Sequence, residues 1–311
     1  MTIVTARPGE PAPTSDPSRV RGAGTRMWTA VRRSPKAVVG LVIFAVFCVL
    51  AAVPQLFTSV RDPMVCCQFE SRLPPSGAHL LGTTQLGQDI FAQLVYGTRE
   101  SLLIALIAGF FATVLSVLIG VSAAYLGGVA DETLSMITNI FLVIPTFPLV
   151  IVLATYAGKG NLLVVVVVLI VTGWSYGANQ LRAQALSLRN RDFLESARVR
   201  GERRSYVIVF EVLPTMTSLI VANFLGAALY SVLTAAGLQF LGLGDPESDS
   251  WGTMLYWAQN QYALQTGIPL WSIAPGVCVA LLGASFALLN YAFDEIGNPA
   301  LRPVRRRRRE G

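Results

Sequence analysis

Charged residues are scarce in this chain. Aspartate, glutamate, lysine and arginine make up 14% of its 311 residues, whereas apolar residues make up 53%. Long stretches contain no charge at all, and these are residues 37–60, 101–130, 133–158, 160–181, 212–244 and 250–293. Each holds roughly 20 or more mostly apolar residues, which lets a helix cross a ~30 Å hydrocarbon core. This distribution excludes an ordinary soluble domain and predicts a membrane protein.

Residues that carry chemistry are also few. His79 is the only histidine, and no set of side chains has metal-ligand spacing. The only Gly-Lys pair, Gly158-Lys159, is followed by glycine, so the chain lacks the GxxxxGK[ST] loop that cradles nucleotide phosphates. Nothing resembles a Ser/His pair or paired intramembrane aspartates. We therefore predict a protein that is not an enzyme, with no catalytic residue, no metal and no cofactor bound by this chain.

The apolar stretches have no ionisable side chain across their centres. Secondary transporters driven by an ion gradient usually place an acidic, basic or histidine side chain within the bilayer. This absence argues against such a transporter, which we keep as the alternative from another functional class.

Four cysteines indicate no disulfide framework. Cys48 and Cys278 lie in apolar stretches, where cysteine usually behaves as a small buried hydrophobic residue. Cys66 and Cys67 are neighbours in a loop. Two free thiols and a strained vicinal disulfide are both open there.

The apolar stretches predict an all-α polytopic membrane protein with six transmembrane helices, at about 37–57, 101–126, 134–157, 162–181, 213–236 and 270–292. Pro145 and Pro148 favour a kink in the third helix. Gly120, Ala124 and Gly128 have the spacing that lets membrane helices approach closely. The segment "FAQLVYGTRESLL" could form an interfacial helix before the second span. The domains expected are a disordered cytoplasmic tail (1–35), the first span with an external segment (36–98), a permease core (99–293) and a basic tail (294–311).

Arginine and lysine concentrate on one side of this topology. They precede the first span, fill the loop 182–212 after the fourth, and follow the sixth, where Arg305–Arg309 form a run. Cytoplasmic loops carry this excess, so both termini and that loop are expected in the cytoplasm. The basic tail fits a contact with anionic membrane lipid. Because no basic stretch is interleaved with aromatic residues, we predict no nucleic-acid partner.

The loop contains an unusually charged window, "DFLESARVRGERRSYVIVFEVLP", at residues 192–214. Asp192 and Glu195 have capping-box spacing, and Gly201 suits the left-handed turn that ends a helix. The window thus predicts a helix of about two turns, projecting from the membrane. Such a helix suits insertion into a groove on a partner protein. The alternative is a polar loop that only holds two spans in register.

The pattern Glu195-Ser196-Ala197, then Gly201, then Leu213-Pro214 resembles the "EAA–G–LP" loop of permease subunits in bacterial ATP-binding-cassette importers. Further segments are similar to the second permease subunit of the oligopeptide/dipeptide branch, and the resemblance covers residues 80 to 302. These segments are "HLLGTTQLGQDIFAQLVYGTRESLL", "AAYLGGVADETLSMITNIFLVIP", "GLQFLGLGDPESDSWGTML" and "NPALRP". The departures from the family's usual residues are Ser196 for alanine, Thr84 for aspartate, Gln88 for arginine and Glu211 for an apolar residue or histidine.

The resemblance implies a type I importer permease fold in the cytoplasmic (inner) membrane. It implies a second homologous permease subunit, two ATP-binding subunits or domains that hold ATP and Mg, and an extracytoplasmic solute-binding protein. The transported solute would be a short peptide, with oligosaccharides or nickel as alternatives.

The charged window would then be the coupling helix seated in an ATPase subunit. Its coupling residues would be Asp192, Phe193, Leu194, Glu195, Ser196, Ala197, Arg200, Gly201, Leu213 and Pro214. Small residues at Ala197 and Gly201 would allow close approach. A bulky side chain at either position is expected to overpack the joint by roughly 1–3 kcal/mol.

Polar side chains within the spans are candidates for the translocation pathway: Asn139, Asn223, Tyr230, Thr234 and Asn290. For each of them, hydrogen bonding between helices is the alternative role. With no charge in the spans, we expect a weakly selective pore, and selectivity would reside in the external binding protein.

Overall fold

The computed structural model of the chain describes residues 34–157, 162–189 and 191–297. Within these ranges the regular structure is helical, apart from an isolated β-bridge between Thr83 and Asp89. The elements are α2 (Pro35–Ala52), η1 (Pro54–Leu56), α3 (Ile90–Leu126), α4 (Gly128–Val143), α5 (Thr146–Ala157), α6 (Leu162–Leu188), α7 (Asp192–Val199), α8 (Arg204–Tyr206), η2 (Val207–Val212), α9 (Leu213–Thr215), α10 (Thr217–Phe240), α11 (Trp251–Asn260) and α12 (Pro269–Gly297).

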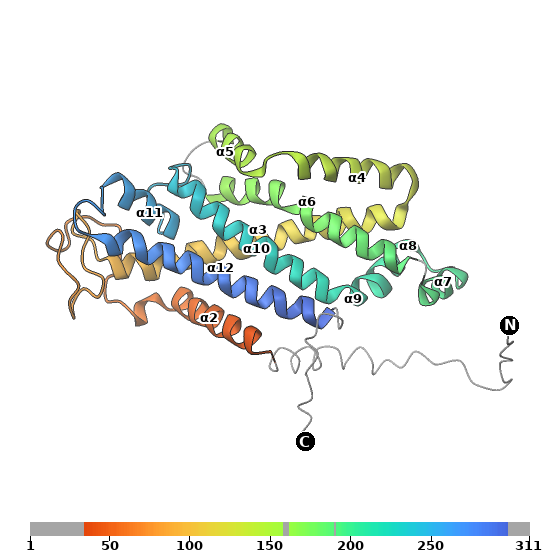
Figure 1. Ribbon diagram of the computed structural model, residues 1–311, viewed down its shortest axis with the longest axis horizontal. Helices are drawn as coiled ribbons and strands as arrows, with labels where there is room; N and C mark the ends of the chain where they lie inside the picture. The colour runs from red at the N-terminus through yellow and green to blue at the C-terminus, as the bar shows by residue number, and fades with distance from the viewer. Residues whose placement is uncertain (1–33, 158–161, 190, 298–311) are drawn as a thin grey trace, which may run out of the picture.

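The long helices run roughly along one axis, with α7 at one end and α11 at the other (Figure 1). We call these the α7 end and the α11 end. Within the described residues, five helices are long and apolar enough to cross a membrane, and they are α2, α3, α6, α10 and α12. The all-α, multi-pass prediction is therefore confirmed.

The third predicted span is broken. Its residues form α4 and α5, which meet at an angle of 91°. Ile144 lies at the break with extended backbone angles (φ −65°, ψ 129°), as expected for a residue that precedes a proline. α3 ends at the α7 end and α6 starts at the α11 end (Figure 1), so the bent pair returns the chain between them. If α4 and α5 together are counted as one broken span, the described residues hold six candidate spans.

α3 is longer than predicted. It runs unbroken for 37 residues from Ile90 to Leu126, so the segment expected as a separate interfacial helix forms its first turns. Asp89 caps this helix, because its carboxylate accepts a hydrogen bond from Ala92 N–H at 2.8 Å. Arg99 and Glu100 lower the local hydropathy without breaking the helix, which explains why the apolar pattern placed the start too late.

Small residues let the central helices pack closely. A Cβ on Gly120 would lie 2.3 Å from the Ala178 carbonyl oxygen, and one on Gly109 would lie 2.8 Å from the Ala228 nitrogen. These contacts bring α3 against α6 and α10 at backbone distance, as is common in membrane bundles. Gly128 has no such role, because it lies beyond α3 with φ +56° and open space around it.

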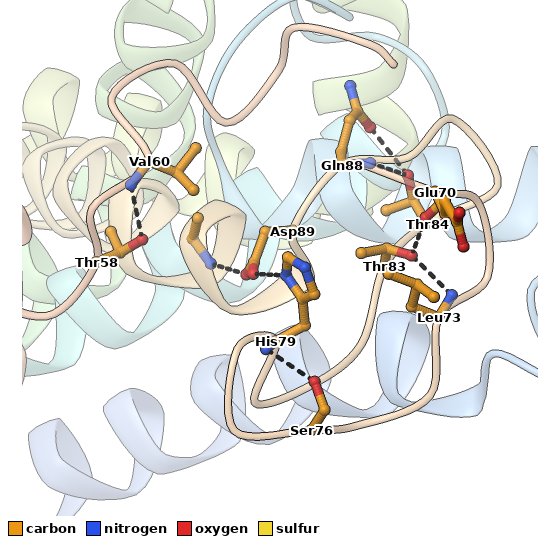
Figure 2. A network of polar contacts seen from close by, with 11 residues as sticks. Thr58, Val60, Glu70, Leu73, Ser76, His79, Thr83, Thr84, Gln88 and Asp89 are labelled. Atoms are coloured by element: carbon orange, nitrogen blue, oxygen red, sulfur yellow. Dashed lines mark hydrogen bonds and ion pairs between the residues drawn. The ribbon is translucent and has the colours of Figure 1, made fainter. Parts of the chain in front are cut away.

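The segment between α2 and α3 folds into loops held by a polar network (Figure 2). The fully buried Thr83 donates to the Glu70 carbonyl at 2.7 Å and accepts from Leu73 N–H at 2.8 Å. His79 Nδ1 lies 2.7 Å from the Asp89 carboxylate. The same carboxylate caps α3, so the network fixes this segment to the start of a membrane helix at the α11 end.

Thr84 also belongs to this network. Its hydroxyl accepts hydrogen bonds from the N–H groups of Leu86 and Gln88, each at 3.2 Å. A side-chain oxygen that accepts from backbone N–H groups two and four residues ahead organises a turn. Threonine therefore supplies the oxygen that stabilises this turn.

Candidate functional site

α7 is an eight-residue helix that projects from the bundle between α6 and the short elements before α10 (Figure 1). Its inner face is apolar, because Leu194 and Ala197 are fully buried. They pack in a cluster with α3, α6 and η2, which includes Val121, Leu181, Val207 and Val212. Glu195, Ser196 and Val199 face outward, and Val199 is 85% exposed. One side of α7 is thus packed on the bundle, and the opposite side is exposed.

The backbone begins α7 at Asp192, because the N–H groups of Leu194 and Glu195 donate to the Arg191 carbonyl at 2.9 and 3.2 Å. Arg191 therefore occupies the capping position in the backbone pattern. The expected capping role of the Asp192 side chain, like the coupling role of Phe193, lies outside the described side chains.

The other end of α7 confirms the predicted stop signal. Gly201 has φ +74°, and the Glu202 N–H donates to the Ala197 carbonyl at 3.2 Å. This is the six-to-one hydrogen bond of a Schellman turn with glycine in the left-handed position. A Cβ on Gly201 would meet nothing within 4 Å, so backbone conformation, not crowding, requires glycine here.

The two small residues of the window therefore serve this chain's own fold. Ala197 is small because it is buried against the bundle, and Gly201 is needed for a positive φ. Within this chain the space around Gly201 is open, so overpacking of a joint with an ATPase subunit at this position stays a prediction. The crowding expected at Ala197 arises inside the bundle.

After α7 the chain passes through α8, η2 and α9. The guanidinium of Arg200 lies 3.7 Å from the Glu202 carboxylate and 4.0 Å from the Glu211 carboxylate. η2 is a π-helical turn directly before Leu213-Pro214. Proline has no N–H to offer the helix, and wider turns are one response to a disturbed hydrogen-bond ladder. The Arg200 guanidinium is the cation that Glu211 faces, and this neighbour accounts for a charged residue at position 211.

An ion pair that the sequence analysis missed ties α4 to α6 near the α7 end. The Arg182 guanidinium donates to both carboxylate oxygens of Asp131, at 2.6 and 2.9 Å. Arg189, seven residues after Arg182 and directly beyond the end of α6, donates to the Ala124 carbonyl at 3.5 Å. Bidentate pairs fix orientation as well as distance. The sequence signal was an aspartate just after one charge-free stretch and an arginine just after another.

A cavity of about 440 Å³ opens between α4, α5, α6, α10 and α12. Among the residues that the structure describes, no charged one lines it. Its polar groups include three of the five predicted pathway residues: Asn223, Tyr230 and Asn290. Thr234 is buried elsewhere on α10, and Asn139 is an exposed residue of α4, so neither lines the cavity. Sequence reasoning missed Thr146, Thr172, Ser175, Tyr176 and Gln180, which also line it.

The lining side chains also hold helices together. The Asn290 amide donates to the Ala222 carbonyl at 2.9 Å, which links α12 to α10. The Tyr230 hydroxyl lies 3.2 Å from that of Thr172, which links α10 to α6. Asn223 packs its amide on Gly177, where a Cβ would approach it to 2.3 Å. Hydrogen bonding between helices, the alternative role, is therefore present at Tyr230 and Asn290.

A known protein family matches the part of the chain that contains α7 and the cavity. Residues 116–295 match the family model described as "binding-protein-dependent transport system inner membrane component". This chain belongs to that family. The matched part runs from within α3 almost to the end of α12, and it includes α7 and the polar cavity. The chain is therefore a multi-pass permease subunit of a binding-protein-dependent importer, a transport component and not an ATP-hydrolysing one.

Curated relatives match over most of their length. The oligopeptide transport system permease protein OppC of Mycobacterium tuberculosis (strain ATCC 25618 / H37Rv) is 30% identical over 82% of this chain and 87% of the relative. The dipeptide transport system permease protein DppC of Bacillus subtilis (strain 168) is 29% identical over 90% and 85%. The glutathione transport system permease protein GsiD of Pectobacterium atrosepticum is 33% identical over 73% and 75%. The family resemblance drawn from residues 192–214 and from the further segments is confirmed.

Proposed function

We propose that this permease subunit imports short peptides across the bacterial cytoplasmic membrane, driven by ATP hydrolysis on separate subunits. The names of its relatives support a peptide as solute, since they are described as oligopeptide, dipeptide and glutathione permeases. A cavity whose described lining residues are all uncharged supports a pore that accepts varied peptides. Selection among solutes would then fall to an external solute-binding protein that delivers them.

The observation that carries the coupling mechanism is the two-sided construction of α7. Leu194 and Ala197 fix the helix to α3, α6 and η2, while Glu195, Ser196 and Val199 remain outside. A force on the outer face would pass directly into the ends of membrane helices. We infer that an ATPase subunit grips this face. Closure of two ATPase subunits around ATP and Mg would pull this subunit and a second, homologous permease together, and so alternate the access of the cavity.

The charge distribution supports an orientation with the α7 end in the cytoplasm. Between the charge-free part of α6 and the start of α10 the sequence carries seven arginines: Arg182, Arg189, Arg191, Arg198, Arg200, Arg203 and Arg204. At the other end, the segment before α3 has Arg61 and Arg72. Cytoplasmic loops carry the excess of positive residues. α2 begins and α12 ends toward the α7 end (Figure 1), so both termini would be cytoplasmic.

Site-specific photocrosslinking tests the coupling role. A photoreactive amino acid replaces Val199, which is 85% exposed on the outer face of α7. The matched control carries it at Leu264, which is 60% exposed in the loop between α11 and α12. We expect crosslinks to an ATPase subunit from position 199 only, identified by mass spectrometry after irradiation of intact cells. Crosslinks to an ATPase from position 264, or none from position 199, would contradict the proposal.

Uptake measurements test the solute. Cells lacking the gene should lose uptake of labelled short peptides, and the full chain should restore it. The same cells should take up labelled oligosaccharide and nickel at unchanged rates. Loss of oligosaccharide or nickel uptake, with peptide uptake intact, would assign the solute to those classes.

A further inference from the structure

Cys66 and Cys67 place their sulfur atoms together at the α11 end. The Cys67 S–H donates to the Cys66 sulfur at 2.9 Å, and both residues are exposed. Side chains of consecutive residues in extended backbone point to opposite sides. Here Cys67 has φ +64°, a conformation that is uncommon for a residue with a side chain. This backbone turn is what brings the two thiols to the same side.

The turn is held by the loop directly before α3. The Cys67 N–H donates to the Leu86 carbonyl at 2.7 Å, and the Phe69 N–H donates to the Gly87 carbonyl at 3.0 Å. Gly87 has φ +65°, and a Cβ there would collide with the Phe69 carbonyl oxygen. The thiol pair is therefore fixed by contacts with residues some twenty positions away, and its geometry does not depend on the two cysteines alone.

We propose that Cys66 and Cys67 form a reversible dithiol–disulfide site, which exchanges electrons with soluble disulfides outside the membrane. The thiolate of one cysteine attacks the disulfide RSSR, giving a mixed disulfide and one RSH after proton uptake. The second cysteine then attacks the protein-bound sulfur of that mixed disulfide and releases the second RSH. Two protein thiols are oxidised to one intramolecular disulfide, and RSSR is reduced to two RSH. The external location rests on the proposed orientation of the permease.

Adjacent cysteines make this site reversible. Their Cα atoms are about 3.8 Å apart along the chain, whereas most protein disulfides join Cα atoms roughly 4.4–6.8 Å apart. The bond between neighbours is therefore strained, and strained, exposed disulfides are the readily reduced ones. Such a site responds to the concentration of soluble disulfides outside the membrane and does not act as a permanent structural disulfide.

The hydrogen bond also distinguishes the two thiols. Because Cys67 donates its proton to Cys66, loss of that proton would break the contact, and this raises the pKa of Cys67 above its ordinary value. Since the thiolate is the attacking species, Cys66 is the better placed to begin the exchange.

The test uses the full chain in its transporter complex, in lipid nanodiscs. Cys48→Ser and Cys278→Ser remove the remaining cysteines, and Cys67→Ser in that background is the matched control. The samples are equilibrated with mixtures of reduced and oxidised glutathione, quenched with an alkylating reagent, and weighed as intact chains. We expect the two-cysteine protein to lose both thiols together. Its mass should then be lower than that of the reduced chain by two hydrogen atoms, with no glutathione bound. Dithiothreitol should restore both thiols. The control should carry one glutathione.

Two results would overturn the proposal. The first is glutathione on both cysteines, and the second is two free thiols under excess oxidised glutathione. A separate arm treats intact cells with a membrane-impermeant maleimide, which should label Cys66 and Cys67 after mild reduction. Labelling by a permeant reagent alone would overturn the external location and the orientation proposed for the permease. Neither arm measures transport, so a wrong solute assignment would leave both results unchanged.

Discussion

Replacing Ala197 by leucine should loosen α7 from the bundle even when no ATPase subunit is present. The Ala197 and Leu194 side chains are both 0% exposed, and among the described side chains of α7 they are the ones that pack on the bundle. Burying a leucine side chain contributes about 1.5–3 kcal/mol, and a methyl group adds about 0.8 kcal/mol. These two side chains therefore contribute on the order of 2–4 kcal/mol to the packing of α7 on the bundle.

Three added carbon atoms at this site should cost about 1–3 kcal/mol through overpacking. That cost offsets much of this contribution. Because every 1.4 kcal/mol is a tenfold change in an equilibrium constant, the amide protons of α7 should exchange about 5 to 150 times faster.

Hydrogen–deuterium exchange of the permease without ATPase subunits measures this directly, with peptides from the middle of α3 as an internal reference. Val199→Leu is the matched control, because its side chain lies outside the bundle and should leave exchange unchanged. Suppose that Ala197→Leu left the exchange of α7 as it was, while weakening ATPase binding. Ala197 would then contact the partner, and the assignment of its side chain to the bundle would be refuted.

Three further predictions concern helix packing, the turn after α7 and solute recognition. Gly120→Ala should lower the thermal midpoint of the solubilised permease, because its Cβ meets a backbone oxygen. The control Gly276→Ala, in open space on α12, should leave the midpoint unchanged or raise it. Equal midpoints for the two variants would be inconsistent with a close contact of α3 and α6. Gly201→Ala should destabilise the end of α7 by about 1–2 kcal/mol through its left-handed backbone, with Gly201→Asn milder in exchange measurements; equal effects would instead indicate crowding. Asn223→Ala should leave the order of preference among competing peptides unchanged in uptake assays, and a changed order would place that amide in the recognition of solute.

The fold was largely predictable because a membrane imposes simple rules on a chain. Charge-free stretches located α2, α6, α10 and α12, since each must shield its backbone from lipid over the whole hydrocarbon thickness. The proline at Pro145 located the break between α4 and α5, but not its angle of 91°. That angle depends on what the two halves pack against. The early start of α3 was missed because Arg99 and Glu100 interrupt an apolar count without interrupting a helix.

The candidate site was predictable only in part. The Gly201 turn follows from local backbone chemistry, so its position in the sequence was sufficient. The direction of the Ala197 side chain was not, because the rotation of a short helix is set by the cluster on which it rests. Asp131 and Arg182 are 51 residues apart, and nothing local pairs them. The lining of the cavity was unpredictable for the same reason, because the rotation of α10 decides that Asn223 lines it and Thr234 does not.

The sequence alone determined that this chain crosses a membrane repeatedly, which loop collects its positive charge, and where a short capped helix interrupts that loop. These features arise from composition, spacing and local backbone preference, which act over a few neighbouring residues. Only the tertiary structure decided which side of α7 is anchored, which polar side chains share one cavity, and that two adjacent thiols face the same way. Those outcomes depend on contacts between segments far apart in the chain, and such contacts exist only once the helices have packed.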